Sequence, residues 1–225
     1  MDRLNVNVRR HAKPDINPET GGSLDSLSSE GIESACNLGK ELYSGIDSTQ
    51  ILGFHSPKQR ARETIDYIFA NANIEGNHCM DKRLDMCIPK EHIKKALLTP
   101  GGEKRPYNTV VQWLMDNPDS EGISFTDYGN VIVSQIQDVV RSFGEPQDEE
   151  SFIEEISHGP LVEAAYINLL ERSGKKIDQI EDMGGGLKPL EGFNLKVDYK
   201  DNTIYTIELQ CRDLVVPMKS YDFLR

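Results

Sequence analysis

The stretch Leu4-Asn5-Val6-Asn7-Val8-Arg9-Arg10-His11 carries alternating apolar side chains that run into two arginines and a histidine. Alternation of apolar and polar residues predicts a β-strand. A central strand of a parallel sheet is usually apolar on both faces, so Asn5 and Asn7 leave the position of this strand in its sheet open. The strand ends at two arginines and a histidine, side chains that can bind anions or act as nucleophiles.

Two more predicted strands have the same design. The segments 50–54 and 151–156 are rich in apolar residues, and they run into Ser56-Pro57 and Ser157-His158-Gly159. Helical spacing of apolar residues predicts helices over 28–42, 58–70, 125–143 and 161–172. Loops are predicted over 13–27 and 144–148, and helix pieces within 88–122 are broken by Pro100-Gly101-Gly102 and by Asn117-Pro118.

The C-terminal part alternates between apolar and polar residues twice. The segments 193–199 and 203–209 flank Asp201-Asn202, which predicts a β-hairpin. Strands that alternate with helices predict an α/β fold. We therefore expect a three-layer αβα architecture with a mainly parallel sheet and an antiparallel C-terminal hairpin at its edge. We expect residues 1–225 to form a single domain.

Composition excludes several classes of function. The chain of 225 residues has 25 basic and 37 acidic side chains, hence a net charge of −12, which is opposite to that of a nucleic-acid or anionic-membrane binder. No apolar run is long enough to span a bilayer, and the first residues do not resemble a secretory signal, so a cytoplasmic location is expected. The cysteines Cys36, Cys79, Cys87 and Cys211 form no Cys-x-x-Cys pair, and neither a metal site nor a cofactor is expected.

The unusual residues gather at the ends of three predicted strands. These groups are Arg10-His11, Ser56-Pro57-Lys58-Gln59-Arg60 and Ser157-His158. Ligands of open α/β sheets bind beyond the carboxyl ends of parallel strands. Two histidines and two arginines are therefore expected to converge there. The glycine run 184–186 lacks the Lys-Ser/Thr of a P-loop, and a plain loop is the favoured interpretation.

The same residues resemble the motifs of a known family. Arg10-His11-Ala12, Ser56-Pro57-Lys58-Gln59-Arg60-Ala61-Arg62-Glu63-Thr64 and Ser157-His158-Gly159 are similar, in this order, to the Arg-His-Gly, Ser-Pro-x-x-Arg-Ala-x-x-Thr and second-histidine motifs of the histidine phosphatase superfamily. This superfamily is also called phosphoglycerate-mutase-like, and the motifs are nearest to those of its small phosphohistidine phosphatases. The resemblance covers most of 4–70 and 150–172.

The resemblance implies a role for each matching residue. His11 would attack phosphorus and become phosphohistidine, while Arg10 and Arg60 grip the phosphoryl oxygens with their planar guanidinium groups. His158 would donate a further hydrogen bond as charge develops. Asn17 and Gly159 fall where members of the family contact the substrate.

The general acid departs from the family pattern. The family often has Leu-x-Glu, but Leu84-Asp85-Met86 puts methionine at the position of the acid. Another branch has an acid directly after the second histidine, where this chain has Gly159. Asp85, Glu91 or no residue at all remain the alternatives.

The resemblance implies a metal-independent phosphatase, a phosphoric monoester hydrolase that acts on a phosphoprotein or a small phosphate ester. Two alternatives remain: a phosphomutase of the same family, and a catalytically inactive relative that keeps the phosphate pocket. Neither the substrate nor the oligomeric state follows from the sequence.

Overall fold

A computed structural model of the chain describes residues 2–19, 22–47, 50–74, 77–143, 150–201 and 203–224. The predicted loop 144–148 and Asn202 of the predicted hairpin turn lie outside these ranges. The strands are β1 (Asp2–Arg10), β2 (Pro14–Ile16), β3 (Ser23–Leu27), β4 (Ile51–His55), β5 (His78–Met80), β6 (Glu150–Ser157), β7 (Gly192–Lys200), β8 (Thr203–Cys211) and β9 (Leu214–Met218). The α-helices are α1 (Ser29–Tyr43), α2 (Gln59–Asn71), α3 (Lys90–Leu97), α4 (Tyr107–Asp116), α5 (Phe125–Phe143), α6 (Leu161–Arg172) and α7 (Ser220–Leu224). Two short 3-10 helices are η2 (Lys82–Leu84) and η3 (Ile180–Met183).

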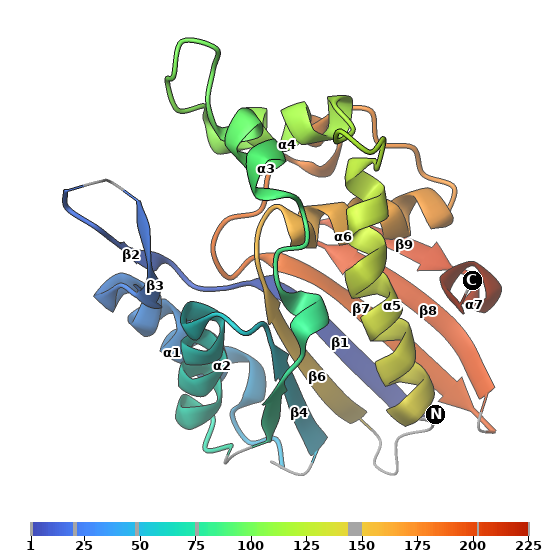
Figure 1. The fold of residues 1–225 in the computed structure, drawn as a ribbon. Helices are drawn as coiled ribbons and strands as arrows, with labels where there is room; N and C mark the ends of the chain where they lie inside the picture. Colours follow the sequence, from blue (N-terminus) through green and yellow to red (C-terminus); the bar gives the residue numbers. More distant parts are fainter. Residues whose placement is uncertain are drawn as a thin grey trace.

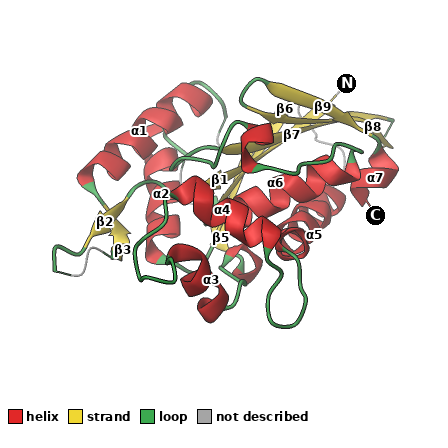
Figure 2. Ribbon diagram, turned by 90° about the horizontal axis from the view of Figure 1, so that it is seen from above, coloured by secondary structure: helices red, strands yellow, loops and turns green. Residues whose placement is uncertain are grey.

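Seven of the described strands form one sheet in the order β5-β4-β6-β1-β7-β8-β9. The strands β5, β4, β6 and β1 are parallel, and β7, β8 and β9 continue the sheet with antiparallel pairing. Helices α1 and α2 cover one face, and α5 and α6 cover the other (Figures 1 and 2). The predicted three-layer αβα class with a parallel part and an antiparallel C-terminal hairpin is confirmed.

Two hydrophobic clusters fill the spaces between these layers. On one side, Tyr43 of α1 and Ile65 and Ile68 of α2 are fully buried. On the other side, Ile132 and Ile136 of α5 pack in a larger cluster that includes the C-terminal strands. The helices therefore form where their apolar stripes meet the sheet, as the periodicity of the sequence predicts.

Strand β1 lies in the middle of the sheet, between β6 and β7, despite its two asparagines. Val6 and Val8 are fully buried in the larger hydrophobic cluster. Asn7 on the opposite face donates to the Tyr43 hydroxyl (3.0 Å) and accepts from Asn194 (2.8 Å). The polar positions are tolerated because buried amides that are hydrogen-bonded cost little.

Some local predictions need correction. The segment 13–27, predicted as a loop, contains the two-stranded sheet of β2 and β3. The predicted hairpin is not the edge of the sheet, because β9 pairs with β8 beyond it, and β5 is a further short strand. These four strands have only three to five residues, so periodicity gives a weak signal for them, and their stability comes from pairing with their neighbours. Among the helices in the described part of the chain, none combines the length and the apolar composition needed to cross a membrane.

Candidate active site

His11 lies just beyond the end of β1, and its side chain is 8% exposed. Its backbone N–H donates to the carbonyl of Ser157 (2.9 Å), which ties it to the end of the parallel neighbour β6. Its Nδ1 lies 2.7 Å from the Ala12 carbonyl oxygen. Since a carbonyl only accepts, Nδ1 carries the hydrogen, and Nε2 of the neutral ring keeps its lone pair. The contact with Ala12 thus fixes the ring through Nδ1 and leaves Nε2, the nucleophilic nitrogen, free of this hydrogen bond.

The protonation state of His11 fits the same role. Burial, followed by the nearby charges of Arg60 and Arg10, lowers the pKa of His11 to about 4. The hydrogen bond to the Ala12 carbonyl opposes this shift, but burial dominates. The imidazole is therefore neutral at pH 7 and able to act as a nucleophile.

His158 stands at the end of β6 and faces the same point. Its ring centroid lies 5.2 Å from that of His11, with an edge-on arrangement of the two rings. Its Nε2 is 2.7 Å from Ser56 Oγ, at the end of β4. Burial, together with His11 and Arg60, lowers the pKa of His158 to about 2. The ends of β1, β4 and β6 thus bring together residues that are more than a hundred positions apart in the chain.

Arg10 is held by partners that leave part of its guanidinium free. Its Nη1 donates to the Leu187 carbonyl, and the group lies 4.3 Å over the Tyr107 ring. The ion pair of Nη1 with Glu163 Oε1 is long, at 3.9 Å, and Nε has no hydrogen-bond partner within the described residues. A buried N–H group without a partner is costly, so it marks a position where a ligand oxygen would be stabilised.

Arg60 reaches the site from the first turn of α2. Its Nη1 is 3.4 Å from the Leu24 carbonyl and 3.9 Å from an Asp25 carboxylate oxygen, so both contacts are loose. Thr64, one turn later, accepts from the Ala12 N–H (3.0 Å), which fastens α2 to the residue after His11. The structure therefore brings together four of the sequence-predicted residues: Arg10, His11, Arg60 and His158.

Asp85 joins them, although it is one position away from the family pattern. Leu84 is fully buried, and its carbonyl accepts from Ser157 Oγ (2.7 Å), which fixes η2 beside the end of β6. Met86 packs against the larger hydrophobic cluster, whereas Asp85 Oδ1 lies 3.7 Å from His158 Nε2. The carboxylate beside His158 thus belongs to Asp85, one residue before the position at which the family pattern places the acid.

Gly159 lies against Arg10 and leaves no space for a side chain. A Cβ atom there would be 2.2 Å from the Tyr107 hydroxyl and 2.5 Å from Arg10 Nε. An acid directly after the second histidine, as in the other branch of the family, is therefore sterically excluded in this arrangement. The glycine allows Arg10 and Tyr107 to pack against the backbone at His158.

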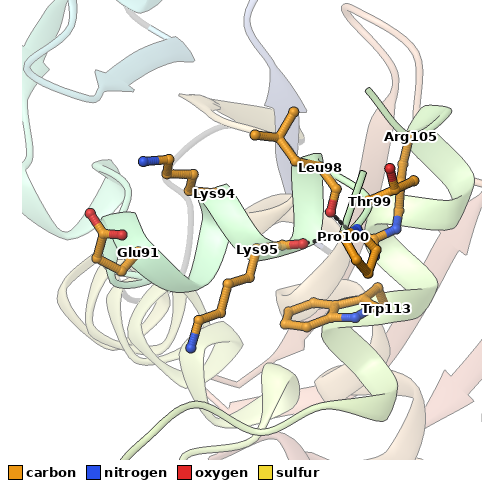
Figure 3. A pocket seen from close by; sticks show the side chains of 8 residues that line it. All are labelled: Glu91, Lys94, Lys95, Leu98, Thr99, Pro100, Arg105 and Trp113. Atoms are coloured by element: carbon orange, nitrogen blue, oxygen red, sulfur yellow. Dashed lines mark hydrogen bonds between the residues drawn. The ribbon is translucent and has the colours of Figure 1, made fainter. Parts of the chain in front are cut away.

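Asn17 and Glu91 do not belong to the strand ends β1, β4 and β6 that carry the histidine cluster. Asn17 belongs to the loop between β2 and β3, where its Oδ1 accepts from the Glu19 N–H (2.8 Å) and its N–H donates to Gly22 (2.8 Å). Glu91 lies on α3, where it lines a cavity between α3 and α4 together with Lys94, Lys95 and Trp113 (Figure 3). None of the residues that line this cavity belongs to the histidine cluster.

Two residues at the site were not predicted from the sequence. The Tyr107 hydroxyl donates to Glu163 Oε1 (2.7 Å), which also accepts from the Leu187 N–H (3.0 Å). Glu163 is fully buried, and burial raises its pKa. The available signal was that Glu163 is the only carboxylate in the apolar segment 159–170. Together these two side chains position Arg10.

Comparison with protein-family models gives no match, and comparison with curated protein sequences gives none either. Solved structures do match. A phosphoglycerate mutase of Bacillus anthracis is 16% identical over 95% of this chain and 93% of its own, with a TM-score of 0.57. A mycobacterial glucosyl-3-phosphoglycerate phosphatase is 17% identical over 94% and 98%, with a TM-score of 0.59, and a protein described as mycobacterial hydrolase 2 is 16% identical over 99% and 96%, with a TM-score of 0.61.

At this level of identity the likeness concerns the fold, and it spans nearly the whole chain. The motifs that resemble the family are those that form the histidine cluster in the structure. The chain has the fold of the phosphoglycerate-mutase-like histidine phosphatases.

Proposed function

We propose that the chain is a phosphatase that transfers a phosphoryl group from a phosphate monoester to His11 Nε2 and then to water. The observation that carries this proposal is the state of His11: its Nδ1 is tied to the Ala12 carbonyl, its pKa is lowered to about 4, and His158 faces it. A neutral imidazole with an available Nε2 is the form that attacks phosphorus.

In this mechanism the cationic side chains hold the phosphoryl oxygens. Arg10 and Arg60 have only long ion pairs, at 3.9 Å, so their guanidinium groups can exchange these contacts for charge-assisted hydrogen bonds to the ligand. His158 is neutral and donates from its ring to a phosphoryl oxygen as negative charge builds up there. In the second step water attacks the phosphorus of phosphohistidine, and the bond to Nε2 breaks. The proposed reaction needs no metal ion, because these side chains supply the positive charge.

We assign the general acid to Asp85. Its Oδ1 lies 3.7 Å from His158 Nε2, and burial of Leu84 keeps it at the end of β6. In the first step it gives a proton to the departing alkoxide, and in the second it takes one from the attacking water. The structure favours Asp85 over Glu91, which lies in the α3–α4 cavity.

The test of the nucleophile is rapid acid-free quenching with a ³²P-labelled phosphate ester. We expect an acid-labile phosphohistidine in the native protein and none in His11→Ala, with turnover unaffected by excess chelator. The control is His92→Ala, because His92 contacts Trp113 outside the histidine cluster. Label on another residue, or turnover lost with chelator and restored by a divalent ion, would contradict the mechanism. Label that passes to a second substrate rather than to water would indicate a mutase.

The test of the acid is the dependence of kcat/KM on the pKa of the leaving group. General acid catalysis raises the rate by about 10²–10⁴-fold, and the increase is largest for substrates with poor leaving groups. We expect a shallow dependence in the native protein, a steep one in Asp85→Asn, and no change in Glu91→Gln. A steep dependence in the native protein as well would show that Asp85 is not the acid.

A further inference from the structure

A cavity of about 430 Å³ lies between α3, α4 and the loop that joins them (Figure 3). Its apolar wall is formed by Leu98, Pro100 and Trp113. The volume lies in the range of pockets that bind small molecules, about 300–1,000 Å³. No residue of the histidine cluster lines the cavity, so a ligand bound here occupies a site of its own.

Trp113 belongs both to the protein core and to the wall of the cavity. It packs against the larger hydrophobic cluster, and its ring centroid lies 5.1 Å from that of His92, which does not line the cavity. The indole is only half-buried, so part of it remains available in the cavity. Such a ring offers a flat apolar surface on which another aromatic ring packs. The contacts with the core hold this surface in place before a ligand arrives.

Arg105 places a fixed positive charge beside the indole. Its Nη1 donates to the carbonyl oxygens of Lys95 (2.6 Å), Ala96 (2.8 Å) and Leu98 (2.5 Å) at the end of α3, and its guanidinium lies 5.7 Å from the centre of the Trp113 ring. These carbonyl groups orient the guanidinium but carry no net charge that would neutralise it. Within the described residues Nε and Nη2 form no hydrogen bond, so both can donate to a ligand.

The charged residues that line the cavity have an excess of positive charge. They are three cations, Lys94, Lys95 and Arg105, and one carboxylate, Glu91, in a chain whose net charge is −12. None of these four forms an ion pair within the part of the chain that the structure describes. Figure 3 shows that Lys95 extends on the same side of α3 as the Trp113 ring, whereas Lys94 extends on the opposite side. A local positive potential of this kind attracts an anion against the overall field of the protein.

The two parts of the lining together restrict the kind of ligand. A neutral apolar molecule would displace water from Arg105 and Lys95 without replacing its hydrogen bonds, which is costly. A simple inorganic anion would leave the apolar surface of Trp113 in contact with water. A ring that carries an anionic group avoids both costs.

We propose that this cavity binds a small molecule with an aromatic ring and a carboxylate, at a site separate from the histidine cluster. The ring packs against Trp113, and the carboxylate accepts hydrogen bonds from Arg105 and Lys95. The site is independent of the proposed phosphatase activity, so its test needs no turnover.

The experiment uses three ligands of similar size: phenylacetate, cyclohexylacetate, which lacks the aromatic ring, and 2-phenylethanol, which lacks the charge. Affinities are measured by calorimetry. Trp113 is the only tryptophan of the chain, so its fluorescence reports whether the ligand lies in this cavity. We expect phenylacetate to change the emission and to bind about tenfold more tightly than 2-phenylethanol, because it gains a charged contact. We expect it to bind about threefold more tightly than cyclohexylacetate, because it gains an aromatic pair.

Two substitutions separate the parts of the site. Lys95→Gln is expected to weaken binding of phenylacetate by about tenfold and to leave that of 2-phenylethanol within about twofold. Trp113→Leu is expected to remove the preference for phenylacetate over cyclohexylacetate. The control is Lys90→Gln, which makes the same change of charge at an exposed residue of α3 that does not line the cavity. Circular dichroism and denaturant unfolding verify that each variant is folded.

Several results would overturn the inference. They are the absence of phenylacetate binding to the native protein, equal affinity for the three ligands, and an equal loss in Lys90→Gln and Lys95→Gln. Competition by inorganic sulfate at the same concentration as phenylacetate would show an anion site without selectivity for the ring. Binding that disappears in His11→Ala but persists in Lys95→Gln would place the ligand in the histidine cluster instead. A protein that turns over no phosphate ester but binds phenylacetate as described would retain this inference while the phosphatase function is rejected.

Discussion

Arg9 and Arg10 are neighbours at the end of β1, but their environments differ completely. Arg9 Nε donates to Glu154 (2.8 Å), and the Tyr43 hydroxyl donates to the other oxygen of that carboxylate (2.5 Å). We call Arg9, Glu154, Tyr43 and Asn7 the paired cluster. Arg10, His11, Arg60 and His158 form the open cluster, in which the arginines have ion pairs of only 3.9 Å.

The two clusters differ in whether their charged groups are paired with each other or are available to a ligand. In the paired cluster each charge is met by a hydrogen-bonded partner, so it stabilises a polar position inside the sheet. In the open cluster, two cationic arginines lie beside two neutral histidines, and the ion pairs of the arginines are long. Such an arrangement costs stability, and under the proposed function a bound phosphoryl group would compensate for it. The presence of an arginine at a strand end does not distinguish the two cases.

The largest expected effect comes from exchanging the two arginines for methionine in turn. Arg10→Met is expected to lower kcat/KM by roughly 10²–10³-fold, because a charged contact to the transferred group is lost. Arg9→Met is expected to keep kcat/KM within about twofold but to lower the free energy of unfolding by about 3 kcal/mol, because Glu154 is left buried without its cation.

Denaturant unfolding and kinetics on one aryl phosphate measure both effects. The double variant Arg9→Met/Glu154→Gln is the control, since it removes the unpaired charge and should recover part of the stability. If Arg9→Met reduced activity as strongly as Arg10→Met, the distinction between the clusters would fail.

A smaller effect is expected from the residues that position Arg10. Glu163→Gln weakens the hold on Arg10 and Tyr107, and we expect kcat/KM to fall by about tenfold, the loss of roughly one hydrogen bond to a charged group. Tyr107→Phe keeps the aromatic ring under Arg10, so we expect it to lower kcat/KM by less than Glu163→Gln does. In an Arg10→Met background neither substitution should have a further effect on kcat/KM. Additive losses in that background would mean that Glu163 acts independently of Arg10.

The protonation of His11 is the next test, through its NMR titration. An ordinary histidine titrates near pKa 6.5, whereas burial lowers that of His11 to about 4. Its ring signals should therefore stay constant from pH 8 down to about 5. Between pH 6.5 and about 4, the histidine is protonated in the unfolded chain but neutral in the folded chain. The free energy of unfolding therefore falls as the pH is lowered through this range. A midpoint near 6.5 would show that burial does not lower the pKa of His11.

The last test concerns stability alone, at two adjacent carboxylates of β6, Glu154 and Glu155. Glu155 is fully buried on the opposite face, neither of its carboxylate oxygens has a hydrogen-bond partner within the described residues, and burial raises its pKa to about 8. The folded state keeps the proton that the unfolded chain loses above pH 4.5, so stability declines as the pH rises from 4.5 to about 8.

Glutamine cannot lose this proton. We expect Glu155→Gln to gain about 3 kcal/mol over the native protein at pH 8 compared with pH 5, because each pH unit between the two pKa values is worth about 1.4 kcal/mol. Glu154→Gln, which weakens the contact with Arg9, is expected to be destabilised at both pH values. Identical pH dependence of unfolding in Glu155→Gln and the native protein would show that Glu155 is ionised in the fold.

Much of the fold follows from local patterns. The bounds of α5 agree with the sequence prediction residue for residue, and α6 begins one residue after Pro160, which was expected in its first turn. The strands β2, β3, β5 and β9 were not predicted: segments of three to five residues give only a weak periodic signal, and β4, of the same length, was recognised from its apolar residues Ile51, Leu52 and Phe54. Their existence depends on partners that the local sequence does not contain.

The sequence by itself determined which four residues, Arg10, His11, Arg60 and His158, meet in the structure, because each follows a strand or begins a helix that is recognisable locally. Only the tertiary structure decided what surrounds them. Asp85 reaches His158 because Leu84 is buried beside β6, and Met86 turns to the core instead. Tyr107 of α4 and Glu163 of α6 lie beside Arg10 because their side chains are joined by a hydrogen bond between two helices that are far apart in the sequence. Contacts between distant segments depend on how whole layers pack, and no short stretch of sequence encodes that arrangement.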